Sequence, residues 1–384
     1  MSMHAPLNWI DLSRSALKQN ISALATLAGK AMLAVSVKAN AYGHGLEPFV
    51  SMLKEHKRVA YLSVHSIEEA VVARQAGWDR RILLLGPAAT NELVAITEFD
   101  IEPTVFTTET LRALGRLSNK TKRPLRTHLK LETGTYRQGI SEREIPVFAS
   151  IYKKYPCLRR PYAASMHFAN IEDTTSHEYA EEQLKKFSSM VRMLSREGVK
   201  PTIRHTACSA AMILFDKTRF EMVRPGISVY GYWSSKETYL SYRLSGKNND
   251  IFTPVLSWKT RITQLKKVPA DSFVGYGCTY RTTAPARIAI VPIGYYDGYP
   301  RAMSNRGYVL VNGRRAPVRG RVCMNLLMVD VTDIKNVRLG AEVTLIGSDG
   351  DERITAGDLA DWGQTIHYEI LARLQASTPR LIAP

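Results

Sequence analysis

Residues 32–45 read Met-Leu-Ala-Val-Ser-Val-Lys-Ala-Asn-Ala-Tyr-Gly-His-Gly, an apolar run that leads one lysine, Lys38, into a turn of small residues. The apolar, partly β-branched half predicts a strand over 32–37, and the glycines predict a turn after it. Taken alone, a lysine behind a strand is typical of a solvated surface group. An amine at a strand end beside flexible backbone also suits imine chemistry with a carbonyl compound, in a site that excludes water.

The same kind of apolar segment recurs through the first 235 residues. Seven more candidate strands follow residues 32–37, and they cover 61–64, 82–85, 103–106, 127–131, 164–168, 203–206 and 222–230. Amphipathic stretches with helical spacing lie between most of them, at 13–27, 66–76, 89–99, 141–154 and 179–197. Eight strands that alternate with helices predict a (β/α)8 barrel of the TIM type.

The pattern of apolar and polar residues changes after Tyr232. The polar segment 234–250 is interpreted as a linker or insertion with little core of its own. Short candidate strands follow at 287–293, 308–311, 316–322, 326–331 and 342–346, with the hairpin signal Asn312-Gly313 between two of them. The tail at 355–362 and 367–374 indicates helix or mixed structure. We therefore expect an α/β protein with an N-terminal barrel domain, 1–240, and a C-terminal mostly-β domain, 241–384.

Composition is consistent with a two-domain globular protein. The chain has 384 residues, of which 45% are hydrophobic, enough for two cores. Its first eight residues lack the basic and apolar regions of a secretory signal, and no run is long enough to span a membrane, so we expect a cytoplasmic protein without membrane contact. The four cysteines lie far apart without metal-ligand spacing, which predicts neither a metal site nor a disulfide framework.

The net charge of +17 is compatible with a nucleic-acid partner, an anionic substrate or a basic surface. The basic residues are scattered, and their short clusters lack the interleaved aromatics of a single-strand binding groove. We therefore favour the last two interpretations and expect no nucleic-acid partner.

Active sites of such barrels lie at the carboxyl ends of the strands, so the residues just behind each candidate strand are the site candidates. They are Lys38, Arg137, His167, His205, Ser209 and Arg224. Any one of them has a structural alternative. A histidine within Met166-His167-Phe168 is more typical of a hydrogen-bonded core, and a lone Arg224 of a salt bridge.

Three motifs together resemble the alanine racemase family. They are the lysine run 35–45, Arg224-Pro225-Gly226-Ile227, and Gly275-Tyr276-Gly277, and the resemblance extends from Asn8 to Arg380. It implies a pyridoxal 5'-phosphate enzyme that interconverts L- and D-alanine and supplies D-alanine for peptidoglycan. It also implies a homodimer with shared active sites.

The resemblance assigns roles residue by residue. Lys38 would carry the cofactor and act as one base, and Tyr276 of the partner subunit would act as the second base. His167 would bias that tyrosine toward its ionised form through hydrogen bonds to it and to Arg224, which would face the cofactor ring. The remaining cofactor-binding residues would be Tyr42, His205, Ser209, Gly226, Ile227 and Tyr368, and the substrate-binding residues Arg137, Met324 and Tyr295. Without the resemblance, Tyr368 is equally well interpreted as a packed aromatic.

The arginine is informative chemically. Because an arginine does not readily give up its proton, a pyridine nitrogen facing Arg224 stays unprotonated and the ring becomes a weaker electron sink. A weaker sink favours plain inversion at the α-carbon over side reactions such as transamination. It also disfavours a decarboxylase of the same architecture.

The chain departs from the family pattern close to the expected substrate and phosphate positions. The segment 132–137 reads Glu-Thr-Gly-Thr-Tyr-Arg where Asp-Thr-Gly-Met-Gly-Arg is usual, Cys208 replaces an asparagine, and Asn325 replaces an aspartate. The chemistry is therefore predicted more firmly than the substrate. Lys130 matches a lysine that some members carry as a carbamate, but a negative charge from Glu132 and an ordinary salt bridge are alternatives.

Two other functions compete with an alanine racemase. A racemase that prefers serine or another small amino acid is one, because an apolar pocket rejects an added hydroxyl only weakly. The other is a binding protein with a racemase-like body that uses its basic surface for nucleic acid, and salt-sensitive binding without racemase activity would identify it.

Overall fold

The computed structural model describes residues 6–158 and 161–384, and the chain divides into two compact units. We call one the barrel unit, which comprises Ala16–Lys38 and Phe49–Thr253. The other, the β-rich unit, comprises the chain up to Ser15, Ala39–Pro48 and Pro254–Pro384. Both units are built from separate stretches of sequence, and the chain passes from the barrel unit to the β-rich unit directly after Lys38. The domain boundary at residue 240 stays a prediction.

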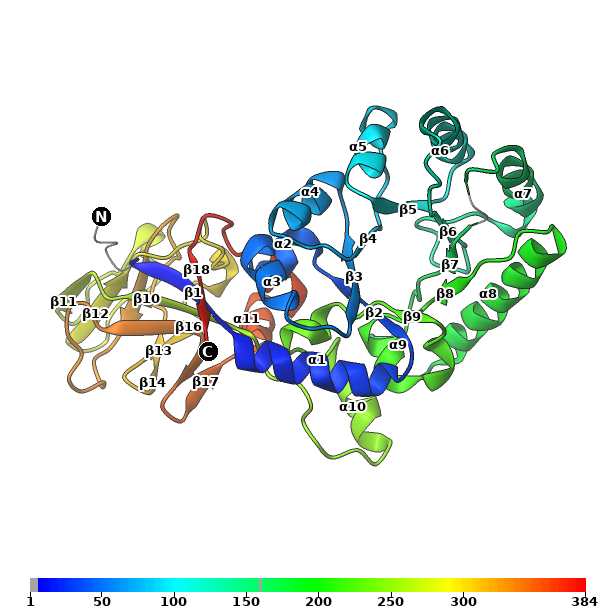
Figure 1. The fold of residues 1–384 in the computed structure, drawn as a ribbon. Coiled ribbons are helices and arrows are strands. Elements are labelled where there is room, and N and C mark those ends of the chain that lie inside the picture. The colour runs from blue at the N-terminus through cyan, green and yellow to red at the C-terminus, as the bar shows by residue number, and fades with distance from the viewer. Residues whose placement is uncertain (1–5, 159–160) are drawn as a thin grey trace. The chain divides into compact units, whose positions relative to one another are not determined.

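The barrel unit contains one sheet of eight parallel strands, in the order β8-β7-β6-β5-β4-β3-β2-β9 (Figure 1). The strands are β2 (Met32–Ser36), β3 (Val59–Val64), β4 (Arg81–Leu84), β5 (Ile101–Val105), β6 (His128–Lys130), β7 (Ala163–Ser165), β8 (Ile203–His205) and β9 (Met222–Val223). The backbone N–H of Arg224 donates to the carbonyl of Ala207 at 2.8 Å, which links the two edge strands. The predicted (β/α)8 barrel is confirmed as a nearly closed ring.

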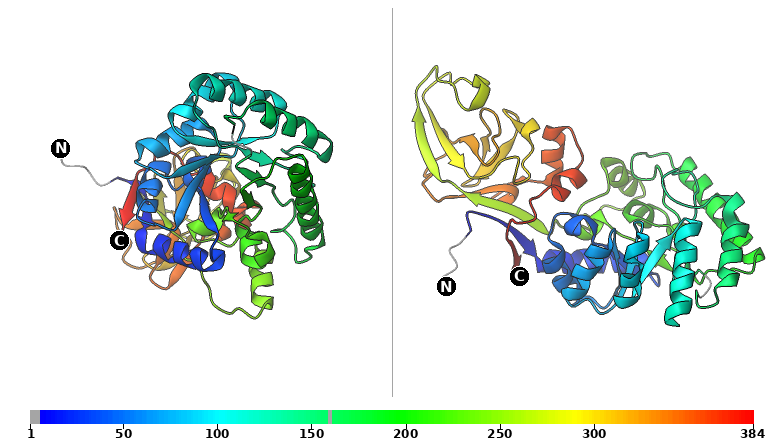
Figure 2. Two further views of the ribbon diagram at one scale, coloured as in Figure 1. Left: turned by 45° about the vertical axis from the view of Figure 1, so that its right-hand side comes forward. Right: turned by 90° about the horizontal axis from the view of Figure 1, so that it is seen from above.

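Helices follow the strands and lie outside the sheet, as Figure 2 shows for those coloured cyan to green. They are α1 (Arg14–Ala28), α3 (Leu46–Leu53), α4 (Ile67–Gln75), α5 (Leu93–Glu98), α6 (Thr108–Thr121), α7 (Ile145–Lys154), α8 (Glu178–Arg196), α9 (Ser209–Leu214) and α10 (Lys236–Leu244). Local sequence sets several starts. The Thr107 hydroxyl accepts from the N–H of Thr110 at 3.2 Å and caps α6, and Ser66 caps α4 in the same way.

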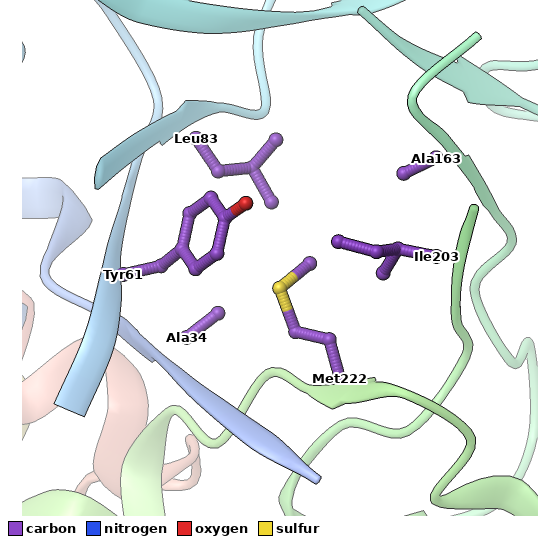
Figure 3. Packing of buried hydrophobic residues seen from close by; sticks show 6 residues of the cluster. All are labelled: Ala34, Tyr61, Leu83, Ala163, Ile203 and Met222. Atoms are coloured by element: carbon purple, nitrogen blue, oxygen red, sulfur yellow. The ribbon is translucent and has the colours of Figure 1, made fainter. Parts of the chain in front are cut away.

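The interior of the barrel is packed with side chains. Six buried residues from six strands meet there: Ala34, Tyr61, Leu83, Ala163, Ile203 and Met222 (Figure 3). They point inward because alternate residues of a strand face opposite sides of the sheet. A filled interior is expected for this fold, and it leaves the strand ends as the place for chemistry.

Two sequence predictions in this unit are corrected. The strand expected over 222–230 ends at Val223, because Pro225 has no N–H for a ladder, and a short 3-10 helix, Ile227–Tyr230, follows. The segment 234–250 is not a coreless linker. Ser235 caps α10 by accepting from the N–H of Thr238 at 2.9 Å, and Tyr242 of that helix is buried.

The β-rich unit contains two sheets. One has the order β14-β13-β16-β10-β1-β18 with β17 added to β16, and the other has the order β11-β12-β15. The strands are β1 (Asn8–Ser13), β10 (Leu256–Arg261), β11 (Gln264–Val268), β12 (Ala286–Val291), β13 (Tyr308–Val311), β14 (Arg314–Pro317), β15 (Leu327–Asp330), β16 (Glu342–Asp349), β17 (Glu352–Ile354) and β18 (Arg380–Ala383). The mostly-β C-terminal region is confirmed.

Local signals in this unit are confirmed as well. Val311 pairs with Arg314, so Asn312-Gly313 forms the predicted two-residue turn, with φ of 48° and 72°. The tail forms α11 (Ala356–Gly363) and α12 (His367–Ala372). β1, from the start of the chain, pairs with β10 and β18.

No helix within the described ranges is long and apolar enough to cross a membrane.

Candidate functional site

Lys38 opens an unusual turn directly behind β2. Ala39, Asn40, Ala41 and Tyr42 all have left-handed backbone angles, with φ between 50° and 55°. Each such residue costs roughly 1–2 kcal/mol relative to a right-handed one, so the turn is held by its surroundings. Within the β-rich unit, the Asn40 side chain accepts from the N–H of Leu46 at 2.8 Å, and Arg380 donates to the carbonyl of Gly43 at 2.8 Å.

Charged groups of both signs in the barrel unit act on Lys38. Arg137 and Lys130 are cationic neighbours, whereas Glu69 and Glu172 raise its pKa. Burial lowers the pKa of the Lys38 amine, and the charge of Arg137 lowers it further. The pKa of Lys130 lies well below its usual value, because the side chain is buried and Arg224, Arg137 and Lys38 are nearby. The ends of β2, β6 and β9 therefore contribute three basic side chains, Lys38, Lys130 and Arg224, and burial favours the neutral form of the two amines.

Arg224, directly behind β9, is buried and densely hydrogen-bonded. Its Nη1 donates to Nδ1 of His205 at 2.5 Å and to the carbonyl of His205 at 2.6 Å, and its Nη2 donates to the carbonyl of Met166 at 2.8 Å. Burial lowers its pKa to about 10, so it stays charged at neutral pH. The guanidinium is thus fixed in one orientation.

His167 and His205 have different surroundings from those the family resemblance implies. Among the described residues, the Arg224 guanidinium donates to Nδ1 of His205, and no hydrogen bond joins it to the ring of His167. Burial, together with Lys130 and Arg224, holds the pKa of His167 well below its usual value. Burial and Arg224 do the same for His205. Both rings are neutral, and His205 uses both nitrogens within the barrel, so it can act on a ligand only through Arg224.

Ser209 lies at the start of α9 beside the loop that follows Arg224. Its Oγ accepts from the N–H of Gly226 at 2.9 Å and from that of Ser228 at 3.5 Å. Because the oxygen accepts, the hydroxyl hydrogen can still be donated. The structure thus joins Ser209 to the backbone of Gly226 and Ser228, which flank the predicted Ile227, and leaves the Ser209 hydroxyl as a donor suited to an anionic oxygen.

The loop after β6 carries Glu132 and Arg137. Oε1 of Glu132 accepts from the N–H groups of Gly134 at 2.5 Å and Thr135 at 2.7 Å, so this carboxylate caps its own loop. Backbone donors accordingly outweigh burial and lower its pKa. Its charge favours a protonated Lys130 but does not outweigh the burial of that lysine. Arg137 is exposed.

The β-rich unit brings the predicted residues Tyr42 and Tyr368 together. Their ring centroids lie 6.2 Å apart at 48°. A Cβ on Gly43 would come within 1.8 Å of the carbonyl oxygen of Leu371, so the turn and α12 approach closely because residue 43 has no side chain. Two phenol groups from distant parts of the sequence thus lie side by side.

Tyr276 lies on a glycine-flanked loop of the same unit. Gly275 and Gly277 have φ of 76° and 72°. A Cβ on Gly275 would come within 2.5 Å of the Met328 methyl group, and one on Gly277 within 2.7 Å of the Arg321 guanidinium. The two glycines therefore let the loop fold tightly while the Tyr276 side chain stays 73% exposed.

Tyr295 and Met324 are joined by their backbones. The N–H of Tyr295 donates to the carbonyl of Cys323 at 3.1 Å, and the N–H of Tyr296 donates to that of Met324 at 3.0 Å. A Cβ on Gly294 would come within 2.2 Å of the Met324 oxygen, so this contact also requires a glycine. The two predicted substrate-binding residues lie on neighbouring loops.

The described residues fit pyridoxal phosphate in two respects. The pKa of the Lys38 amine is lowered, which raises the fraction of neutral, nucleophilic amine, and the Ser209 hydroxyl can donate to a phosphate. The Arg224 guanidinium offers a fixed cation for a ring nitrogen. In the described part of the chain, no three His, Cys, Asp or Glu side chains are placed to hold a metal ion.

Sequence reasoning missed two residues inside the barrel, Glu102 and His128. His205 Nε2 lies 2.9 Å from Nδ1 of His128, and Nε2 of His128 lies 2.9 Å from Oε2 of Glu102. Both side chains are buried. The signal that could have found them is a charged or polar residue within an apolar strand segment.

Comparisons with known proteins agree with this arrangement. The family model for the alanine racemase N-terminal domain matches residues 12–234, and that for the C-terminal domain matches residues 255–382. The alanine racemase of Leptospira interrogans is 38% identical over 381 residues, which covers 98% of this chain and 95% of the relative. That of Halothermothrix orenii is 39% identical over 97% of this chain and 96% of the relative.

Solved structures agree in the same way. The crystal structure of alanine racemase from Bacillus anthracis with bound L-Ala-P matches with a TM-score of 0.91 at 30% identity, over 100% of this chain and 96% of that one. Alanine racemase from Streptomyces lavendulae matches with a TM-score of 0.89 at 29% identity, over 99% and 98%. Because the two family models cover most of the chain and these relatives match it over nearly their whole length, the chain belongs to the alanine racemase family of amino-acid isomerases.

Proposed function

We propose that the protein is a pyridoxal phosphate-dependent racemase that interconverts L- and D-alanine by a two-base mechanism. The single observation that carries the proposal is the Lys38 amine. It lies at the end of β2, its pKa is lowered by burial and by Arg137, and Lys130 of β6 is a second basic neighbour. An aldehyde cofactor with a phosphate and a substrate with a carboxylate both match that environment.

When bound, pyridoxal phosphate supplies an electron sink that acidifies the α-proton of the amino acid. The residues that would hold it are Tyr42, Ser209, Gly226, Ile227 and Tyr368 at the phosphate, and Arg224 at the ring nitrogen. His205 would orient Arg224, to which it is hydrogen-bonded. A guanidinium keeps its proton, so Arg224 would leave that nitrogen unprotonated.

Inversion at a carbon requires that a proton leave one face and return to the other. Lys38 would serve one face of the α-carbon, and Tyr276 of the partner subunit would serve the opposite face. Arg137 and the N–H of Met324 would bind the substrate carboxylate, and Tyr295 would line the substrate entrance. His167, neutral and surrounded by cations, would bias that tyrosine toward its ionised form.

The proposal includes a physiological setting. The protein would work as a homodimer in the cytoplasm and supply D-alanine for peptidoglycan. Dimerisation is required by the two-base mechanism in this form, because the second base would come from the partner.

The test compares wild type with Lys38→Ala for visible absorbance and for D-alanine formation from L-alanine. We expect a cofactor absorbance band and racemisation in wild type, and the loss of both in Lys38→Ala. Lys30→Ala is the matched control, because Lys30 is an exposed lysine just before the same strand. A wild type that stays colourless and inactive after pyridoxal phosphate is added would overturn the proposal.

The same assay separates alanine from serine. We expect a higher kcat/KM for alanine than for serine. A preference for serine would keep the mechanism and replace the substrate.

A further inference from the structure

A continuous chain of hydrogen bonds runs through the interior of the barrel behind Arg224. It passes from the Arg224 guanidinium to His205 at the end of β8, then to His128 on β6, and ends at Glu102 on β5. The four side chains are 8%, 1%, 0% and 3% exposed, respectively. All four belong to the barrel unit.

Arg224 is the first residue of this series, and it fixes the direction of every hydrogen bond in it. Arginine has only donors, so Nδ1 of His205 accepts at 2.5 Å and that ring carries its hydrogen on Nε2. His205 Nε2 then donates to Nδ1 of His128, and His128 Nε2 donates to Oε2 of Glu102, each at 2.9 Å. One arrangement of hydrogens satisfies all three contacts, and all donors point toward the carboxylate.

Glu102 is held in its ionised form from the far side. Tyr61 donates to Oε2 at 3.1 Å, and Arg81 and Arg126 lie 3.7 Å and 3.5 Å from Oε1. Arg81 also donates to the hydroxyl of Tyr61 at 2.6 Å. Burial opposes ionisation of Glu102, but the hydrogen bonds from His128 and Tyr61 and the charge of Arg81 lower the pKa of the carboxyl.

Among the described residues, no carboxylate pairs with the Arg224 guanidinium. In the described part of the barrel, its side chain donates only to the ring of His205 and to backbone carbonyls. A buried cation without a counter-charge is costly. Each imidazole in the chain is polarised by the carboxylate behind it, so the negative charge of Glu102 strengthens the bond that His205 accepts from Arg224.

We propose that Glu102 and His128 are positioning residues, which fix the tautomer of His205 and supply the counter-charge for Arg224 through two neutral imidazoles. The inference rests on the proposed function only for its catalytic consequence, because the hydrogen-bond chain lies wholly in the protein. A carboxylate that accepts from one imidazole nitrogen fixes which nitrogen is free to accept on the other side.

The first measurement is the imidazole ¹⁵N spectrum of histidine-labelled protein without added cofactor. The protein has nine histidines, so the variants His128→Gln and His205→Gln are needed to assign the ring signals of these two residues. In wild type, both rings are expected to carry hydrogen on Nε2 alone. Hydrogen on Nδ1 of either ring would overturn the proposal. The measurement does not depend on whether a Glu102 variant folds.

The second measurement uses Glu102→Gln, which keeps the shape but replaces the carboxylate with an amide that can donate or accept. We expect mixed tautomers at His128 and His205, a kcat about tenfold lower, and a KM within about twofold of wild type. Glu221→Gln is the control, since Glu221 pairs with Arg204 beside His205 but is partly exposed and outside the chain of hydrogen bonds. It should leave both tautomers and kcat unchanged.

The outcomes separate the two proposals. A wild type with the expected tautomers but without racemase activity would retain the hydrogen-bond chain and remove the proposed function. An active wild type whose ring signals are identical in Glu102→Gln would retain the racemase and remove the role of Glu102.

Discussion

The barrel unit buries most of its candidate site residues, whereas the β-rich unit exposes the side chain on which its proposed chemistry depends most. Arg224 is 8% exposed and His205 is 1% exposed, but Tyr276 is 73% exposed. In the barrel, burial and neighbouring charges lower the pKa of Lys38, Lys130, His167 and His205. In the β-rich unit, backbone geometry does the positioning, through glycines at 43, 275, 277 and 294.

The difference indicates two ways to prepare a residue for proton transfer. A barrel side chain receives its protonation state from a low-dielectric interior. A side chain on an exposed loop receives its place from the backbone, and its protonation state must come from whatever packs against it in the assembled enzyme. Substitutions in each unit can separate these two contributions.

The largest expected effect is on the exposed side chain. Tyr276→Phe removes one hydroxyl from a side chain that is already solvated, so thermal stability should not change. If this hydroxyl is the second base, kcat should fall about 10²- to 10⁴-fold, the range that general acid–base groups contribute. The measurement is the rate of racemisation in both directions together with a thermal melt.

Tyr308→Phe is the matched control, because it removes the hydroxyl of another partly exposed tyrosine in the same unit. It should keep both rate and stability. A Tyr276→Phe enzyme with wild-type kcat would show that the exposed loop has no catalytic role. Only the inference that burial sets protonation states in the barrel unit would then be retained.

The next effect concerns the turn after Lys38. In Gly43→Ala, the new Cβ would come within 1.8 Å of the Leu371 oxygen at a φ of +79°. Since both the turn and α12 would have to move, we expect a loss of about 3 kcal/mol or more in the free energy of unfolding, measured by urea denaturation. Activity should fall as well, because Tyr42 precedes this glycine.

Gly29→Ala separates strain from crowding. Gly29 has a φ of +58°, but a Cβ at this position would meet nothing within 4 Å, so only the backbone cost of about 1 kcal/mol should remain. Equal losses in the two variants would contradict the close approach of the turn to α12.

The barrel could be predicted from sequence because its strands are short apolar runs, and amphipathic stretches with helical spacing lie between most of them. All eight predicted segments contain a strand. The beginning of β5 was missed because Glu102 interrupts its apolar pattern, although the residue is buried among hydrogen-bond partners. A period of two in the sequence shows which residues face inward, but it cannot show that a charged one finds a partner there.

The β-rich unit was predicted less completely for a different reason. Its hairpin at Asn312-Gly313 is a local signal, but the pairing of β1 with β10 and β18 joins the start, the middle and the end of the chain. Nothing in the local pattern of Asn8–Ser13 indicates these partners. The side-by-side position of Tyr42 and Tyr368 depends on equally distant contacts, and only the family resemblance suggested it.

The smallest effect is a pH dependence within the β-rich unit, which also contains a fully buried histidine. Burial lowers the pKa of His44 to about 3, and Arg380 adds to that effect. The unfolded chain takes up a proton near pH 6.5 while the folded protein does not, so this histidine contributes stability above pH 6.5 that is lost progressively as pH falls toward 3. Between pH 6.5 and 5 the loss is at most about 2 kcal/mol.

The measurement is the free energy of unfolding at pH 7 and pH 5, for wild type and for His44→Gln. The variant should lose less stability between the two pH values, whatever its stability at pH 7, because the other titrating groups cancel in the difference. His65→Gln, at an exposed histidine, should keep the wild-type dependence. If His44→Gln kept it too, low-dielectric control of protonation would belong to the barrel unit alone, and the contrast between the two units would be sharper than proposed here.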